Sequence, residues 1–202
     1  MKKLFTAFCA VASLSGPVAA APVVGRPAPN FSLVAANGKP VSLSDYRGKT
    51  VVLEWSNPGC PFVKKHYGSG NMQKAQATAA REGVVWLTIN SSAPGKQGHM
   101  NSAGASAFIA DSKARPTAYL LDPSGSAGRA YQAKTTPHMF VVNKAGTLVY
   151  AGGIDDKPTA NPADIPGARN HVLAALAELK ANKPVSVPTS RPYGCSVKYA
   201  DS

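Results

Sequence analysis

The sequence predicts a single α/β domain built on one mixed β-sheet with helices on its faces. Two mostly apolar runs, at residues 50–56 and 84–90, are typical of strands that are buried on both faces of a parallel sheet. Helical patterns alternate with these runs, and a hairpin signal lies at either end of the array. The chain has 202 residues, of which 44% are hydrophobic, so it is long enough and apolar enough for one ordinary core.

The amino-terminal elements follow from a turn signal, an apolar run and a helix start. Asn37-Gly38 lies between residues 31–34 and 41–43, and this dipeptide is a strong signal for a β-hairpin turn. The run at 50–56 is the first central strand. A helical pattern then begins at Pro61, which suits the first position of a helix because its missing N–H would have no partner there.

The middle of the chain continues the alternation of helix and strand. The helical pattern stops at residues 68–70, where Gly, Ser and Gly interrupt it, and resumes over residues 71–82. The second central strand, at 84–90, is followed by a loop rich in Ser, Gly and Pro. A helix near residues 103–112 and a short strand at 118–121 complete this part.

The carboxyl-terminal part predicts a second hairpin, a helix and an extended tail. Residues 139–143 and 147–151 are strand-like and flank a Lys-Ala-Gly turn. After a Pro-rich loop, apolar residues recur at helical spacing over residues 168–180. Prolines at 184, 188 and 192 oppose regular structure in the last segment, which we expect to be extended.

The first twenty residues have the pattern of an export signal. Two lysines precede an apolar stretch over residues 4–14, and Gly16-Pro17 ends it before the small residues Val18-Ala19-Ala20. No later run is apolar over the roughly 18 residues that a membrane span needs. We therefore expect periplasmic export with a cleaved signal peptide at 1–20, a globular domain at 21–181 and an extended tail at 182–202.

The charge pattern and the cysteine content exclude several classes of protein. The chain carries 22 Lys+Arg against 10 Asp+Glu, a net charge of +12, but the basic residues are scattered. Without an Arg/Lys stripe or interleaved aromatic residues, no nucleic-acid partner is expected, and neither is stable membrane insertion. Three cysteines are too few for a disulfide scaffold or a zinc ribbon. No resident cofactor or metal is expected.

Cys60 is the candidate nucleophile. It lies between the end of the strand at 50–56 and the helix that begins at Pro61, so we expect it to cap that helix. The positive end of a helix dipole stabilises a thiolate near the first N–H groups and thereby lowers the pKa of the thiol. Lys64, one turn further along the same helix, is expected to add positive potential.

Several segments resemble the redoxin branch of the thioredoxin superfamily, which is related to the alkyl hydroperoxide reductase/thiol-specific antioxidant family. The resemblance extends over residues 25–156, and the segments that carry it are Pro27-Ala-Pro-Asn-Phe31, Leu43-Ser-Asp-Tyr-Arg-Gly-Lys49, Cys60-Pro-Phe-Val-Lys64, Thr136-Pro137 and Gly152-Gly-Ile-Asp-Asp156. It implies a thioredoxin-like fold and a redox-active cysteine. It also implies a cis Pro137 that faces Cys60, with Pro61, Thr136 and Pro137 lining the groove where a disulfide partner docks.

The chain departs from both parent patterns. A thioredoxin has Cys-x-x-Cys, but Val63 occupies the position of the second cysteine. A peroxiredoxin has Pro-x-x-x-Thr-x-x-Cys, and here Leu53 and Asn57 stand at the Pro and Thr positions. Pro137 stands where the peroxiredoxin arginine is expected. Neither parent mechanism is therefore complete, and what remains is one activated cysteine beside a groove.

A single thiolate completes a redox cycle only when a second thiol resolves it. Cys195 is the only internal candidate for that thiol, and the segment from Gly194 to Lys198 resembles the ending of some peroxiredoxin-like redoxins. A free or structural cysteine is the alternative role, and an external thiol is the alternative resolving group.

We therefore expect a periplasmic thiol-dependent oxidoreductase that uses Cys60 and exchanges electrons with a thiol donor or a protein disulfide. Thiol–disulfide exchange is favoured over peroxide reduction because two peroxidase determinants are replaced. A thiol peroxidase that reduces hydroperoxides is the second hypothesis, and a redoxin that only binds its partners is also kept.

A copper-binding protein on the same fold is a further hypothesis. Soft sulfur and imidazole suit copper, and the candidate ligands are Cys60, His66, Met72, His99-Met100 and His138-Met139. No Cys-x-x-x-Cys pair or Met-rich tract accompanies them, and methionines are more often core residues. This hypothesis therefore stands behind the enzymatic ones.

Overall fold

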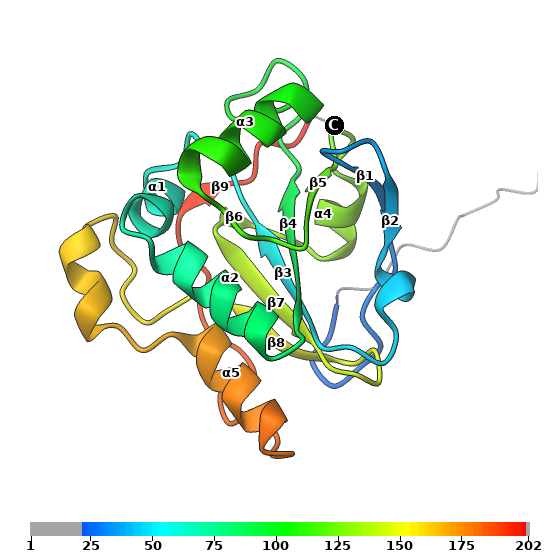
Figure 1. Ribbon diagram of the computed structural model, residues 1–202, viewed down its shortest axis with the longest axis vertical. Helices are drawn as coiled ribbons and strands as arrows, with labels where there is room; N and C mark the ends of the chain where they lie inside the picture. The colour runs from blue at the N-terminus through cyan, green and yellow to red at the C-terminus, as the bar shows by residue number, and fades with distance from the viewer. Residues whose placement is uncertain (1–21, 201–202) are drawn as a thin grey trace, which may run out of the picture.

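The computed structural model describes residues 22–200 and has a seven-stranded mixed sheet at its centre (Figure 1). Its strands are β1 (Ser32–Ala35), β2 (Pro40–Ser42), β3 (Val51–Trp55), β4 (Val85–Asn90), β5 (Ala118–Leu121), β7 (His138–Val142) and β8 (Leu148–Gly152). Their order is β2-β1-β5-β4-β3-β7-β8. The pairs β3–β4 and β4–β5 are parallel and the others are antiparallel. The export signal expected over residues 1–20 lies outside the described residues.

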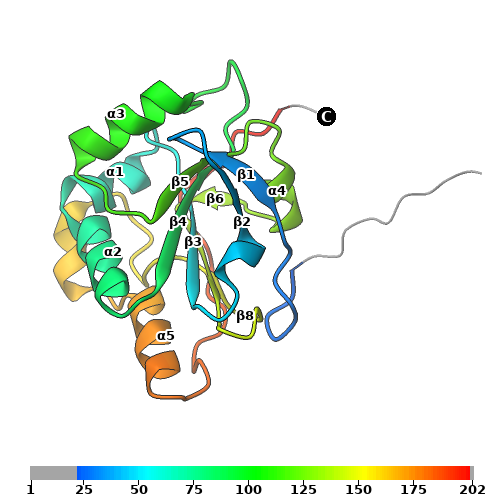
Figure 2. The ribbon, with the colours of Figure 1, turned by 45° about the vertical axis from the view of Figure 1, so that its right-hand side comes forward.

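Helices cover both faces of this sheet (Figure 2). They are α1 (Pro61–Gly68), α2 (Asn71–Arg81), α3 (Ser102–Ser112), α4 (Ser126–Ala130) and α5 (His171–Lys180), with 3₁₀ turns η1 (Leu43–Tyr46) and η2 (Pro162–Gly167). Helices α1, α2 and α5 lie on one face, and α4 lies on the other. Alternate residues of β3 serve the two faces: Val52 packs with the three helices, whereas Leu53 and Trp55 pack with Phe140 and Tyr131.

The structure confirms the predicted fold class, and each predicted strand and helix is present in the predicted order. The first hairpin turns at Asn37-Gly38, where Gly38 has a φ of +81°, a conformation that glycine adopts without steric cost. The expected break at residues 68–70 separates α1 from α2. Both central strands are fully buried, as their apolar runs predict.

Two local features differ from the sequence-based expectation. Helix α4 was not predicted, because five residues are too few to show a helical period; the Asp122 carboxylate supports it by accepting from the Gly128 N–H at 2.9 Å. Helix α5 begins at residue 171 rather than 168. The Asn170 side chain accepts a hydrogen bond from the Leu173 N–H at 2.9 Å and so acts as the N-cap.

The segment after α5 runs back over the body of the protein instead of leaving it (red in Figure 1). It first follows β8, where the Ala151 N–H donates to the Pro188 carbonyl at 3.1 Å. It then forms β9 (Cys195–Ser196), which pairs antiparallel with β6 (Thr135–Thr136). Over residues 22–200, no helix is both long enough and apolar enough to cross a membrane.

Candidate active site

Cys60 is the N-cap residue of α1, as its position between strand and helix predicts. A turn after β3 delivers it, in which the Cys60 N–H donates to the Asn57 carbonyl at 3.0 Å and the Asn57 side chain accepts from the Gly59 N–H at 2.8 Å. Pro61 follows at the first helical position. The cysteine itself has 0% exposure, so its thiol is enclosed by protein.

The Thr136–Pro137 peptide lies against Cys60 and is cis, as the family resemblance implied. The Cys60 thiol donates to the Thr136 carbonyl, with 3.0 Å between sulfur and oxygen. Both Thr136 and Pro137 are buried, while Pro61 is exposed at the start of α1. The structure thus brings these four sequence-predicted site residues together at one end of β3 and β7.

Strand β9 brings Cys195 to the same place. In the β6–β9 pair, Cys195 stands directly opposite Thr136, and the Thr136 hydroxyl donates to the Cys195 carbonyl at 3.4 Å. Directly opposed residues of an antiparallel pair project to the same face, and Cys195 is close enough to Cys60 for each thiol to shift the pKa of the other. Both are free thiols.

Gly194 allows this close approach of the tail. Its φ is +124°, and a Cβ atom at this position would lie 2.1 Å from the Thr136 carbonyl oxygen. Any other residue here would therefore need the backbone to shift. The tail also pairs with Thr136, one of the three residues expected to line the docking groove.

The two thiols differ in acidity. Burial raises the pKa of Cys60, but hydrogen bonding with the side chains of Cys195 and Thr136 and with the backbone of Val63 and Cys195 outweighs it, so the pKa of Cys60 is lowered. Burial raises the pKa of Cys195 to about 11, and the hydrogen bond to Cys60 and the charge of its thiolate act in the same direction. Cys60 is therefore the thiol that ionises first.

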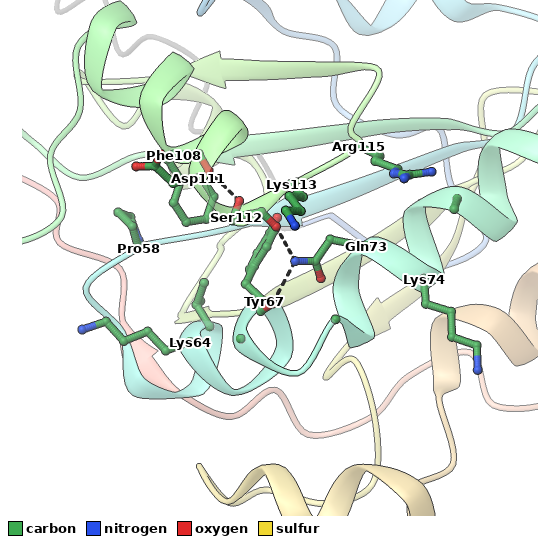
Figure 3. A pocket seen from close by; sticks show the side chains of 14 residues that line it. Pro58, Lys64, Tyr67, Gln73, Lys74, Phe108, Asp111, Ser112, Lys113 and Arg115 are labelled. Atoms are coloured by element: carbon green, nitrogen blue, oxygen red, sulfur yellow. Dashed lines mark hydrogen bonds between the residues drawn. The ribbon is translucent and has the colours of Figure 1, made fainter.

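Lys64 is exposed on α1, and its side chain extends away from the helix (Figure 3). The groups that lower the pKa of Cys60 belong to Cys195, Thr136 and Val63, and Lys64 is not among them.

A pocket of about 700 Å³ lies beside α1, between α2 and α3 (Figure 3). Tyr67 and Phe108 contribute apolar walls, and Gln73 closes one end by donating to the backbone carbonyls of Tyr67 and Ser112 at 2.8 and 2.6 Å. The charged residues of its lining are Lys64, Lys74, Asp111, Lys113 and Arg115. Cys60 does not line this pocket, so it is a neighbour of the reactive thiol rather than its access route.

Glu54 is a buried carboxyl group in β3 that the sequence analysis did not single out. It is 0% exposed and accepts hydrogen bonds from Tyr67, Gln76, Trp86 and Thr88 at 2.8 to 3.4 Å. Burial raises its pKa, although the four donors act in the opposite direction. A glutamate inside a strand buried on both faces was the available signal, because such a group requires partners.

The residues at the peroxiredoxin positions have structural roles. Leu53 is part of the apolar core. The Asn57 amide donates to the Gln97 carbonyl and to its side-chain oxygen at 3.1 and 3.0 Å, while the Asn57 oxygen holds the Gly59 N–H. Asn57 therefore fixes the turn before Cys60.

The candidate copper ligands are engaged with different partners. His138 Nδ1 accepts from the Lys134 N–H, His99 Nδ1 contacts the Ser92 carbonyl, and the Met100 sulfur accepts from Tyr119. Among residues 22–200, no group of three His, Cys, Asp or Glu side chains is arranged to hold a metal ion.

A family model described as AhpC/TSA matches residues 24–151. The chain belongs to this family. A curated relative, the thiol-disulfide oxidoreductase ResA of Bacillus subtilis (strain 168), is 27% identical over 125 residues. That match covers 62% of this chain and 64% of the relative, which is less than two thirds of either protein.

Solved structures show the same fold. A hypothetical protein from Sinorhizobium meliloti 1021 superposes with a TM-score of 0.75 at 23% identity, covering 91% of this chain and 98% of that one. An uncharacterized conserved protein from Geobacillus kaustophilus gives 0.74 at 25% identity, with 89% and 94% covered. A putative thiol:disulfide interchange protein DsbE from Chlorobium tepidum gives 0.53 at 25% identity, with 65% and 85% covered. The thioredoxin-like fold is thereby confirmed.

Proposed function

We propose that this protein is an exported thiol–disulfide oxidoreductase in which Cys60 is the nucleophile and Cys195 its internal disulfide partner. The observation that carries the proposal is that Thr136 joins the two cysteines: its carbonyl accepts from the Cys60 thiol at 3.0 Å, and Cys195 stands opposite it in the β6–β9 pair. The lowered pKa of Cys60 and the raised pKa of Cys195 support the assignment of their roles. The names of the Bacillus subtilis and Chlorobium tepidum relatives describe the same type of reaction.

The reaction begins with attack of the Cys60 thiolate on one sulfur of a substrate disulfide. The substrate S–S bond breaks, its second sulfur leaves as a thiolate that takes up a proton, and Cys60 holds the first sulfur in a mixed disulfide. Cys195 then loses its proton and attacks the Cys60 sulfur, which releases the second substrate thiol. Two electrons have moved to the substrate, and a Cys60–Cys195 disulfide remains for an external dithiol donor to reduce.

Peroxide reduction is the second candidate, and the enclosure of Cys60 favours it. A thiol with 0% exposure is reached more readily by a small oxidant than by a protein disulfide. Attack of the thiolate on a hydroperoxide oxygen releases the alcohol or water and leaves a sulfenic acid on Cys60. Condensation with the Cys195 thiol expels water and produces the same internal disulfide.

Stopped-flow kinetics of the reduced mature protein separates the two candidates. Mixing with oxidised glutathione and, separately, with hydrogen peroxide gives two second-order rate constants, and a peroxide constant larger by orders of magnitude would select the peroxidase. Cys60→Ser is expected to abolish both reactions. Cys195→Ser is expected to stop after the first step, with a mixed disulfide or a sulfenic acid on Cys60.

Peptide mass spectrometry under non-reducing conditions then tests the internal partner. Oxidation with one equivalent of diamide is expected to yield a linked peptide that contains Cys60 and Cys195 from the same chain. The absence of that peptide, with only external adducts on Cys60, would overturn the role of Cys195.

Export to the periplasm is part of the same proposal. Its support is the amino-terminal pattern of two lysines, an apolar stretch and small residues. Amino-terminal sequencing of the protein from a periplasmic fraction should begin near Ala21. A chain that keeps Met1 and stays with the cytoplasmic fraction would contradict this prediction.

A further inference from the structure

Four ionisable side chains that the proposed exchange does not use are buried together beside the cysteine pair. Lys65 and His66 come from α1, Asp155 from the loop after β8, and Tyr193 from the tail. Their exposures are 2%, 0%, 4% and 8%. Charged and hydrogen-bonding groups are rarely buried unless they are paired, so their contacts show what the cluster does.

The hydrogen bonds of the cluster form a chain from His66 through Tyr193 to Asp155. Tyr193 donates its hydroxyl proton to the Asp155 carboxylate at 2.5 Å, because a carboxylate has no proton to give. The Tyr193 oxygen therefore accepts from His66 Nε2, which lies 3.2 Å away. With its proton on Nε2, neutral His66 accepts at Nδ1 from the Asn71 amide at 2.8 Å. Burial lowers the pKa of His66 to about 4, which keeps the ring neutral at ordinary pH.

The aromatic ring of Tyr193 makes two further contacts with α1. It packs edge-to-face on Phe62 with 5.9 Å between ring centroids, and the Lys65 ammonium lies 5.7 Å from its centre. Lys65 is itself fixed by donating to the Lys157 carbonyl at 2.9 Å. Phe62, Lys65 and His66 all belong to α1, the helix that Cys60 caps.

Tyr193 is also only two residues away from Cys195 in the tail. Gly194, which separates them, has no side chain with which to anchor the chain. On the amino-terminal side of Cys195, Tyr193 is therefore the first residue whose side chain can join the tail to α1, the helix that Cys60 caps. A link of this kind raises the effective concentration of one thiol at the other.

We propose that Tyr193 is a positioning residue, which holds Cys195 against Cys60 through its hydrogen bonds to His66 and Asp155 and its ring contacts with α1. It forms no bond with the reacting sulfurs. It fixes the distance over which the Cys195 thiolate attacks the Cys60 sulfur of a mixed disulfide, and so sets how fast and how completely the internal disulfide forms. This inference rests on the proposed function.

The test compares two tyrosines of the same tail. Tyr193→Phe keeps the ring but removes the donor to Asp155, whereas Tyr199→Phe removes a hydroxyl that donates to the Ala133 carbonyl at 2.8 Å on the other side of Cys195. Each protein is equilibrated in mixtures of reduced and oxidised glutathione, and the fraction with the Cys60–Cys195 disulfide gives the effective concentration of the two thiols. Circular dichroism confirms that each variant is folded.

Tyr193→Phe is expected to lower the effective concentration roughly tenfold, because a hydrogen bond to a buried charged group is lost. Tyr199→Phe is expected to stay within about twofold of the parent. Asp155→Ala removes the same bond from the other side and should reproduce the loss, so that the test does not depend on a single variant. The double variant should then lose little more than either alone.

The outcomes distinguish the inference from the function beneath it. If the parent protein forms no internal disulfide at any glutathione ratio, the proposed function fails. The positioning role of Tyr193 is overturned if the parent forms the disulfide but the effective concentration in Tyr193→Phe and Asp155→Ala stays within twofold of the parent value. It is also overturned if that concentration falls no further in these two variants than in Tyr199→Phe.

Discussion

Each residue at the site owes its acidity to a competition between burial and hydrogen bonding. Burial alone would make Cys60 a weaker acid, and four hydrogen-bond interactions reverse the direction of the shift. Glu54 also has four donors, yet its burial prevails and its pKa is raised.

The first prediction concerns the pKa of Cys60, read from the ultraviolet absorbance of its thiolate as pH rises. In Cys195→Ser, the serine hydroxyl replaces one thiol donor, and the midpoint should lie below the roughly 8.5 of a free cysteine. In Cys195→Ala that donor is gone, so the midpoint should be higher than in the serine variant. A midpoint at or above the free value in Cys195→Ser would show that burial prevails.

The second prediction concerns Glu54 and stability. Because the folded protein holds this proton more tightly than the unfolded chain does, the free energy of unfolding should fall as pH rises from the ordinary glutamate pKa through the raised one. Glu54→Gln cannot ionise, so it should lack this slope. It should also be less stable by about 1–3 kcal/mol at low pH, since its amide brings two N–H donors among groups that themselves donate, whereas the protonated carboxyl brings one O–H.

Urea denaturation of both proteins at a series of pH values measures this effect. The stability advantage of the parent over Glu54→Gln should shrink as pH rises across that window. An advantage that stays constant with pH would mean that Glu54 titrates alike in the folded and unfolded states.

At the scale of elements, the site is assembled by α1 and two very short strands. The sequence predicted α1 and its capping cysteine because Pro61 and the preceding strand are local signals. It could not predict β6 and β9, because two residues show no period and their pairing joins positions some sixty residues apart. For the same reason, an extended tail was predicted but not its return to Cys60.

The cluster around Tyr193 escaped prediction for a related reason. Nothing in the segments of Lys65, His66 and Asp155 indicates that these side chains contact one another, and only the fold buries them together. The cis peptide before Pro137 was expected from resemblance alone, since nothing local in Thr136-Pro137 requires it. Local sequence patterns thus predicted the helices and strands, whereas long-range contacts determine the chemistry of the Cys60–Cys195 pair.

The third prediction tests the docking of β9. In Gly194→Ala, the new Cβ would meet the Thr136 carbonyl oxygen, and the positive φ adds strain, so the tail should leave β6. Closure of the internal disulfide should slow by roughly tenfold or more, and Cys60 should alkylate faster with iodoacetamide as it becomes exposed. Gly167→Ala is the matched control, since it meets nothing within 4 Å. Equal rates of disulfide closure in Gly194→Ala and Gly167→Ala would show that β9 does not hold Cys195 in place.

At the scale of the whole molecule, the excess of positive charge includes a local group of cations in the pocket beside α1. The chain carries +12, and four cations but one carboxylate line the pocket beside α1. Within residues 22–200, none of these four cations has an ion-pair partner. Unpaired charges around a concave surface focus the field and raise the local concentration of anions.

The last prediction is therefore that the protein reacts faster with anionic than with cationic disulfides. Stopped-flow rates with oxidised glutathione should exceed those with cystamine, and the ratio should shrink as salt shortens the Debye length from about 30 Å at 0.01 M to about 8 Å at 0.15 M. Lys74→Glu/Lys113→Glu reverses two pocket charges and should lower the ratio severalfold. Lys39→Glu/Lys183→Glu makes the same change in net charge at exposed sites outside the pocket lining, and should lower it less. If the two double variants lower the ratio equally, the preference follows from net charge alone. If the ratio does not change with salt concentration, the preference is not electrostatic.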